Sequence, residues 1–277
     1  MKRALALLAP LLLAAAPAHR IELTNDRLFL PVEVDGVTVP GLLDSAAEVS
    51  AVDDGLARRL ALRLEGGDEV KGTGGTARVR FAGGVTLAAA GLRLAPATVA
   101  VLDLDEVVGR LVHRPTEVIL GRELFDAGRL RIDISGGRIA AVPPGRAPRG
   151  VRLPLVTRKG VETFPVVVEG HPPVWADFDL GNGSEVLVGR AYAERIGLAA
   201  PGRIRGRKAG GGIGGAVERD LVVLETLRVA GRTFHDVPAA IDPLPNAADL
   251  NVGTAILKHF AITTDFPQHR LWLEALR

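Results

Sequence analysis

Two aspartates, Asp44 and Asp179, are the residues of this chain whose type and placement best fit a chemical reaction. They lie about half the chain apart. Each follows an apolar run typical of a β-strand and precedes a segment typical of a short helix. Two carboxyl groups held close together can share one proton, and the pair can then activate a water molecule by acid–base catalysis. The first hypothesis is therefore hydrolysis by a pair of aspartates.

The sequence around the two aspartates is duplicated. Residues 119–139 align without a gap to residues 251–271, which places Gly121 on Gly253 and makes the apolar positions coincide. Earlier in each half, the segment FLPVEVDGVTV corresponds to FPVVVEGHPPV. A repeat of this length indicates a duplicated domain rather than the short units of a solenoid.

These motifs resemble those of the retropepsin-like and pepsin-like aspartic peptidases, whose signature is Asp-Thr/Ser-Gly-Ala/Ser. The first copy here reads LLDSAAEVSAV and the second reads FDLGNGSEVLV. Each half also contains the second element of the family, two apolar residues and a glycine. It occurs as Ile119-Leu120-Gly121 and, less regularly, as Asn251-Val252-Gly253. The resemblance covers nearly all of residues 22–277.

The resemblance implies an all-β fold of two tandem retropepsin-like β-barrel lobes with short helices, related by a pseudo-two-fold axis. Short alternating or β-branched runs bounded by Gly, Pro or Asp also indicate a chain that is mostly strand. We expect four segments: a signal peptide at 1–18, an N-terminal lobe at 19–142, a linker at 143–150 and a C-terminal lobe at 151–277. Two linked lobes can build the site without dimerisation, so we expect a monomer.

Both copies of the aspartate motif depart from the family pattern. Ala46 replaces the glycine of the first copy, and its Cβ restricts the backbone and crowds the space beside the carboxylates. Leu180 replaces the Thr or Ser of the second copy, so Ser45 alone can make the hydrogen bonds across the lobes that the resemblance implies. Gly181 keeps the family residue. Two functions remain open: an exported aspartic endopeptidase, and a degenerate relative that binds peptides or a partner protein without cleaving them.

Other aspartates have simpler explanations. Aspartate before Ser or Gly often closes a turn, but the matched second copy favours a catalytic pair for Asp44 and Asp179. Asp133 and Asp265 also match across the repeat, and we interpret both as turn-capping residues. Asp177 precedes Asp179 by two residues and shares its face on a strand. It either raises the pKa values of the pair or points into solvent.

Two glycine-rich hairpins occupy corresponding places in the two halves. They contain Gly72, Thr73, Gly74 and Gly75 in the first half and Gly211, Gly212, Ile213 and Gly214 in the second. One interpretation is a pair of substrate-binding flaps that close over an extended peptide and exclude water. The alternative is a pair of flexible turns, since glycine is common in turns. Neither hairpin is followed by the Gly-Lys-Ser/Thr of a phosphate-binding loop.

The composition gives no support to other chemistry. The six histidines lack metal-ligand spacing, the serines lack a G-x-S-x-G context, and the chain has no cysteine. We therefore expect no metal and no cofactor, and a peptide or protein as substrate. Basic and acidic residues balance once the leader is removed, which gives no electrostatic reason to expect nucleic acid.

The first residues form a targeting signal. Lys2 and Arg3 precede an apolar run over residues 4–16, and Ala16-Pro17-Ala18 matches an A-x-A cleavage site. We expect cleavage after Ala18 and a periplasmic or secreted protein with no stable membrane span. An uncleaved membrane anchor is the alternative, although the run is short for a spanning helix.

Overall fold

The structure is a computed structural model that describes residues 17–72, 74–105, 112–143, 147–183 and 185–276. Most of the predicted leader, Thr73 of the first hairpin and the middle of the predicted linker lie outside these residues. Within them the chain is mostly strand with short helices, and the predicted all-β fold of two tandem lobes is confirmed. None of the described helices is long and apolar enough to cross a bilayer.

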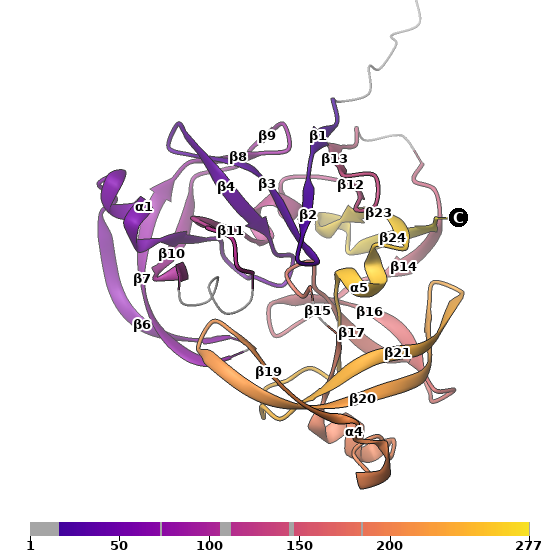
Figure 1. Cartoon of the computed structure of the whole chain (residues 1–277). Helices are drawn as coiled ribbons and strands as arrows, with labels where there is room; N and C mark the ends of the chain where they lie inside the picture. Colours follow the sequence, from indigo (N-terminus) through magenta and orange to yellow (C-terminus); the bar gives the residue numbers. More distant parts are fainter. Residues whose placement is uncertain (1–16, 73, 106–111, 144–146, 184, 277) are drawn as a thin grey trace, which may run out of the picture.

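The first lobe is built on a ten-stranded sheet (Figure 1). Its strands are β2 (Glu22–Thr24), β3 (Arg27–Val34), β4 (Val37–Leu43), β5 (Ala51–Asp53), β6 (Leu64–Gly72), β7 (Gly75–Val85), β8 (Leu87–Ala89), β9 (Leu92–Arg93), β10 (Ala97–Leu102) and β11 (Val118–Leu120). Two short helices accompany it, α1 (Asp54–Arg59) and α3 (Arg122–Asp126). The order along the sheet is β6-β7-β10-β5-β11-β4-β3-β8-β9, with β2 paired to β3.

The second lobe repeats this arrangement on an eight-stranded sheet. Its strands are β15 (Val156–Arg158), β16 (Val161–Val168), β17 (Val174–Phe178), β18 (Val186–Gly189), β19 (Gly206–Gly212), β20 (Gly215–Val229), β21 (Arg232–Asp242) and β22 (Leu250–Val252). The helices are α4 (Arg190–Arg195), η1 (Pro201–Arg203) and α5 (Thr254–Leu257). The order β17-β22-β18-β21-β20-β19 reproduces β4-β11-β5-β10-β7-β6 of the first lobe.

A third, six-stranded sheet joins the two lobes (Figure 1). It contains β1 (His19–Arg20), β12 (Leu130–Asp133), β13 (Arg138–Ala141), β14 (Val151–Pro154), β23 (Phe260–Asp265) and β24 (Arg270–Ala275), and η2 (Phe266–Gln268) lies between the last two. At its centre β12 and β23 are antiparallel, and Arg131 pairs with Thr263. Each of these residues is the repeat counterpart of the other, so the pseudo-two-fold axis passes between them.

Local sequence explains how the loop that begins at Asp44 comes to follow a strand. Asp35 and Gly36 both have positive φ values, which is the conformation of a tight two-residue hairpin turn. This turn sets the register of β3 and β4, with Val34 opposite Val37. Strand β4 then continues to Leu43, and the next residue is Asp44.

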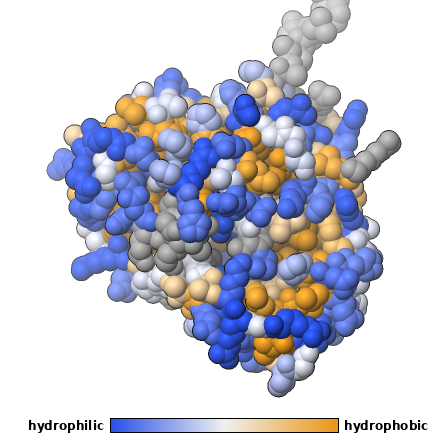
Figure 2. Space-filling model, viewed as in Figure 1, coloured by the Kyte–Doolittle hydropathy of each residue, from blue (hydrophilic) through white to orange (hydrophobic). Residues whose placement is uncertain are grey.

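Aromatic side chains pack where the lobes meet. Phe125 of α3 stacks on Phe266 of η2 with ring centroids 4.9 Å apart, and Phe178 packs edge-on against Phe266 at 6.3 Å. All three rings are fully buried, so the lobes share one apolar core. Figure 2 shows a largely hydrophilic surface on the face in view, with scattered apolar patches of the kind found on ordinary soluble proteins.

One prediction about turns is wrong. Asp133 does close a turn, because its Oδ1 accepts a hydrogen bond from the Gly136 amide at 2.7 Å. Asp265, its repeat counterpart, makes no such cap. Its carboxylate is buried and accepts hydrogen bonds from Arg129 of the first lobe at 2.7 and 3.1 Å. Sequence context could not distinguish a turn cap from an ion pair between lobes.

Candidate active site

Asp44 and Asp179 lie at the ends of the matching strands β4 and β17. The Asp44 amide donates to the Leu120 carbonyl at 3.0 Å, and the Asp179 amide donates to the Val252 carbonyl at 3.2 Å. Each aspartate is thus anchored to the strand that carries the second family element of its own lobe. The structure places both predicted catalytic residues in equivalent positions.

Each carboxylate is held by the backbone of its own loop. Oδ1 of Asp44 accepts hydrogen bonds from the amides of Ala46 at 2.9 Å and Ala47 at 3.1 Å. Oδ1 of Asp179 accepts from Gly181 at 2.8 Å and Asn182 at 3.0 Å. The loop with Ala46 therefore makes the same hydrogen bonds as the loop with the family glycine.

The two loops touch across the lobe boundary. A Cβ at Gly181 would overlap the carboxyl group of Asp44. Ser45 Oγ donates to the Phe178 carbonyl at 2.7 Å and accepts from the Leu180 amide at 2.9 Å. Leu180 has no hydroxyl, and its side chain is buried in the core. The hydrogen bonds that Ser45 makes to the second loop are thus present. At the matching position of the second loop, apolar packing of Leu180 takes the place of such hydrogen bonds.

Burial and the closeness of the two carboxyl groups shift their pKa values. Burial is the main reason that the pKa of Asp44 is raised to about 7, and the charge of Asp179 and a hydrogen bond with it add to the effect. Burial also raises the pKa of Asp179, but a hydrogen bond from Asn251, two backbone amides and the charge of Arg27 oppose it. Asp179 is therefore the member of the pair that is better stabilised as an anion.

Three polar residues near the pair were not predicted as site residues. Asn251 donates to Oδ2 of Asp179 at 2.7 Å. Arg27 is almost fully buried and its positive charge acts on both aspartates. Asp177 was predicted to perturb the pair or to face solvent; it is half-buried, and burial and the charge of Asp179 raise its pKa to about 7. The irregular Asn-Val-Gly element was the one sequence signal that could have identified Asn251.

The tips of the two glycine-rich hairpins, one from each lobe, touch each other. They are the β6–β7 and β19–β20 hairpins, and the Gly74 amide donates to the Ile213 carbonyl at 3.0 Å (Figure 1). A Cβ at Gly74 would overlap the carbonyl oxygen of Gly215. The tips are therefore in backbone contact, which requires glycine. Gly72, Gly211, Gly212 and Gly214 lie in the same hairpins as predicted.

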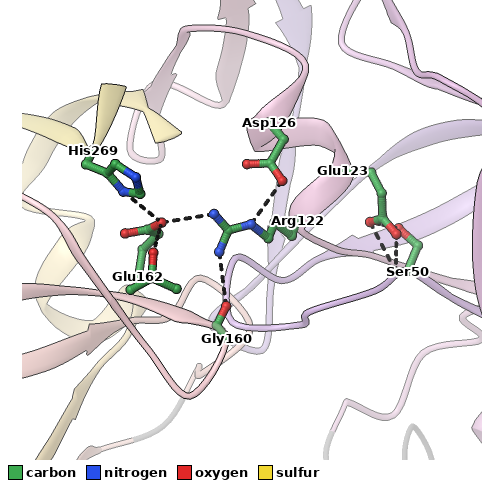
Figure 3. A network of polar contacts seen from close by, with 8 residues as sticks. Ser50, Arg122, Glu123, Asp126, Gly160, Glu162 and His269 are labelled. Carbon is green, nitrogen blue, oxygen red and sulfur yellow. Dashed lines mark hydrogen bonds and ion pairs between the residues drawn. The ribbon is translucent and has the colours of Figure 1, made fainter. Parts of the chain in front are cut away.

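Charged side chains fix the loop after Asp44 and connect it to the second lobe (Figure 3). Glu123 accepts hydrogen bonds from the amide and the hydroxyl of Ser50 at 2.7–3.1 Å. Next to it along α3, Arg122 donates to the Gly160 carbonyl at 3.1 Å and to Glu162 at 3.0 Å. Glu162 is fully buried, so this ion pair ties the first lobe to the interior of the second.

Among the described residues, no group of three or more His, Asp or Glu side chains is placed to hold a metal ion. The carboxyl pair can itself perform acid–base chemistry. One carboxylate can accept a proton and the neighbouring carboxylic acid can donate one.

The sequence also matches a known protein family. The family described as aspartyl protease matches residues 30–124 and 164–256. No curated protein matches the chain. Among solved structures, the chain is similar to a retropepsin-like aspartic protease from Rickettsia conorii, with 14% sequence identity and a TM-score of 0.36 over 46% of this chain and 96% of that one. The two family matches span one lobe each and together cover more than half of the residues, so the chain belongs to the aspartyl protease family.

Proposed function

We propose that this protein is an exported aspartic endopeptidase that hydrolyses peptide bonds with Asp44, Asp179 and an activated water. The observation that carries the proposal is the pair of carboxyl groups at equivalent strand ends, in two loops that Ser45 bridges by hydrogen bonds. Family membership supports peptide substrates, because acid–base hydrolysis of peptides is what the family name describes.

Because Asp179 is the better stabilised anion, we assign the role of base to Asp179 and the role of acid to Asp44. Ionised Asp179 takes a proton from water while the water oxygen attacks the carbonyl carbon of the peptide. Protonated Asp44 gives its proton to the carbonyl oxygen, so that a neutral tetrahedral diol forms. Asp179 then gives the proton it took from water to the nitrogen, and ionised Asp44 takes a proton back from a diol hydroxyl. Cleavage of the C–N bond restores the carbonyl group and releases the amine. An inhibitor with a tetrahedral hydroxyl should bind tightly because it resembles this intermediate.

A second candidate function is peptide or partner binding without cleavage. Leu180 favours binding without cleavage, because its buried apolar side chain has no hydroxyl with which to hydrogen-bond the first loop. Retention of both aspartates, with all their backbone hydrogen bonds, favours catalysis.

Cleavage of a mixed peptide library distinguishes the two functions. The wild-type protein should cleave at acid pH, and Asp44→Asn and Asp179→Asn should each abolish cleavage while leaving the thermal unfolding midpoint close to the wild-type value. Ser45→Ala should weaken cleavage without abolishing it. Binding of library peptides without cleavage by the wild type would support the second function.

Export and a monomeric state are part of the proposal and rest on the leader sequence and the linked lobes. N-terminal sequencing of the protein from fractionated cells should give His19 as the first residue, in the periplasm or the medium. Recovery of the full chain in the membrane fraction would support an anchor instead. Light scattering of the purified protein should give the mass of one chain.

A further inference from the structure

An open cavity of about 460 Å³ lies on the second lobe, between the β16–β17 turn and the paired strands β20 and β21. We call it the remote pocket, and its lining includes Val167, His171, Pro172, Thr226, Arg228 and Thr233. Strand β17 begins beside this pocket and ends just before Asp179. At about 3.3 Å per residue, the five residues of the strand separate the pocket from the aspartate pair by roughly 17 Å.

Four polar side chains line the remote pocket without serving the fold. Arg228 is exposed, and its guanidinium makes no hydrogen bond, ion pair or ring contact with another described residue. The imidazole of His171 and the hydroxyls of Thr226 and Thr233 likewise have no hydrogen-bond partner within the described part of the chain. One cavity therefore gathers a guanidinium, an imidazole and two hydroxyls that remain available to a ligand.

No carboxylate neutralises Arg228. The described residues that line the remote pocket include no Asp or Glu. The acid of the adjoining turn, Glu169, accepts hydrogen bonds from Arg203 at 2.5 Å and from the Glu225 amide at 2.8 Å. The Glu225 carboxylate lies 3.8 Å from the same Arg203 guanidinium. Both neighbouring acids are thus paired with another arginine, and the charge of the remote pocket is positive.

The repeat provides an internal comparison, because the first lobe builds the same place with a different charge. In the second lobe Arg228 of β20 lies opposite Val167 of β16. In the first lobe the matching strands place Ala88 opposite Glu33. The second lobe has therefore lost a carboxylate and gained a guanidinium in adjacent positions.

Two further positions follow the same trend. The residue after the turn is Val37 in the first lobe and His171 in the second, and both turns have the same two positive φ values before it. On the other side of the central strand, Arg93 of the first lobe corresponds to Thr233 of the second. The first lobe thus balances one acid against one base, whereas the second carries an arginine and a histidine with no acid.

The chemistry of the lining fits a carboxylate that is attached to an apolar group. A guanidinium donates two parallel hydrogen bonds to a planar carboxylate, and the hydroxyls and imidazole are further donors beside it. Val167, Pro172 and Pro173 offer apolar surface to the rest of the ligand. A phosphate monoester carries a charge of about −1.5 to −2, which the single guanidinium would leave partly unmatched.

We propose that the remote pocket is a binding site for a carboxylate with a small apolar body, either the free terminus of a peptide or a small organic acid. Arg228 binds the carboxylate, Thr226 and Thr233 donate to it from the same sheet face, and the two prolines contact the apolar body. The aspartate pair plays no part in this binding, so the site does not depend on the proposed peptidase activity.

The first test varies the ligand in NMR titrations of the whole protein. N-acetylvaline should bind about tenfold or more tightly than its neutral amide, because the amide cannot accept charge-assisted hydrogen bonds. Inorganic phosphate should bind more weakly than N-acetylvaline. Equal affinity for acid and amide, tighter binding of phosphate, or no binding of N-acetylvaline at millimolar concentration would overturn the proposal.

Two further probes identify the source of the carboxylate. Isovalerate is a free acid with the same branched body, and N-acetylalanylvaline is a peptide terminus. Tighter binding of the dipeptide would assign the remote pocket to peptide termini, whereas equal affinities would show that a small organic acid suffices.

The second test installs first-lobe residues in the second lobe. Arg228→Ala should weaken the binding of N-acetylvaline about tenfold or more, to the level of the amide. Val167→Glu keeps Arg228 but places a carboxylate opposite it, and it should weaken binding to a similar extent. The control Arg93→Ala removes an exposed arginine from the matching place of the first lobe and should leave the affinity unchanged. Thermal unfolding midpoints near that of the wild type confirm that each variant is folded.

The remaining comparison separates the remote pocket from the aspartate pair. Asp44→Asn should bind N-acetylvaline as tightly as the wild type. Loss of binding in Asp44→Asn would place the acid at the aspartate pair and refute the remote pocket. Unchanged affinity in both Arg228→Ala and Val167→Glu would refute it as well.

Discussion

Asn251 donates a hydrogen bond from Nδ2 to Oδ2 of Asp179 at 2.7 Å. The orientation of this amide is fixed from the other end. Asn182 Nδ2 donates to the Glu185 carbonyl at 3.2 Å and to Oδ1 of Asn251 at 2.8 Å, so Nδ2 of Asn251 must face the aspartate. The matching residue of the first lobe is Ile119, which cannot donate to Asp44. This difference makes Asp179 the better anion of the pair.

Replacement of Asn251 by the first-lobe residue should therefore shift the acid limb of the pH–activity profile. Asn251→Ile removes a hydrogen bond to the carboxylate, so the pKa of Asp179 rises and less of it is ionised in acid. A bond to a charged group contributes about 1.5–3 kcal/mol, so the limb should move up by roughly 1–2 pH units. Ile119→Val, which alters no polar contact, is the control. An unmoved acid limb would mean that Asn251 only fills space.

The alkaline limb should report Asp44. Its pKa is raised to about 7, and the mechanism requires it to be protonated. Activity should accordingly fall as the pH rises through about 7, which gives a bell-shaped profile of kcat/KM centred on acid pH. Full activity at pH 9 would contradict an acid role for Asp44.

The free energy of unfolding should fall as the pH rises from about 4 to about 7. The pKa of Asp177 is raised from 3.8 to about 7 in the folded protein. The folded state therefore binds more protons than the unfolded state in this window, and stability decreases with pH. Asp177→Asn should flatten the dependence seen in urea unfolding, and Asp68→Asn on an exposed strand position should not. A slope equal to that of the wild type in Asp177→Asn would refute this assignment.

Contact between the hairpin tips should be needed for turnover. In Gly74→Ala the new methyl group meets the Gly215 carbonyl, so the tips must separate by on the order of 1 Å. Displacements of this size cost up to about 100-fold in rate. Gly83→Ala, in β7 of the same hairpin, puts its Cβ 3.9 Å from Thr98 Oγ1, an ordinary van der Waals distance, and is the control. If both variants have the same kcat/KM, the hairpins are turns without a role as flaps.

Replacing one partner of the Arg122–Glu162 ion pair between the lobes should lower the free energy of unfolding more than replacing both partners. Arg122→Met leaves the fully buried Glu162 carboxylate without its guanidinium partner and should lower the free energy of unfolding by about 3 kcal/mol. Adding Glu162→Met should recover much of the loss. Arg195→Met, from an exposed pair, should cost no more than about 1 kcal/mol. Urea unfolding of the four proteins checks the series.

The sequence predicted the parts of the site that are local in the chain. Asp44 and Asp179 could be found because each ends a strand and has a partner at the same place in the repeat. The effect of Leu180 also followed from its side chain alone. Arg27 could not be found in this way, since its role depends on how the two lobes meet, and Asn251 was marked only by its irregular Asn-Val-Gly element. The error at Asp265 has the same origin, because its partner Arg129 lies 136 residues away.

The central sheet, in which Arg131 pairs with its repeat counterpart Thr263, joins the two half-sites within one chain. This joining affects how mutations act on the site. In an assembly of two identical chains, every change in the gene appears at both half-sites. Joining the halves in one chain gives each its own codons. One half can then acquire an amide beside its carboxylate, as at Asn251, while the other keeps the serine, Ser45, that bridges the loops. The fusion thus allows a single mutation to alter one side of the cleft.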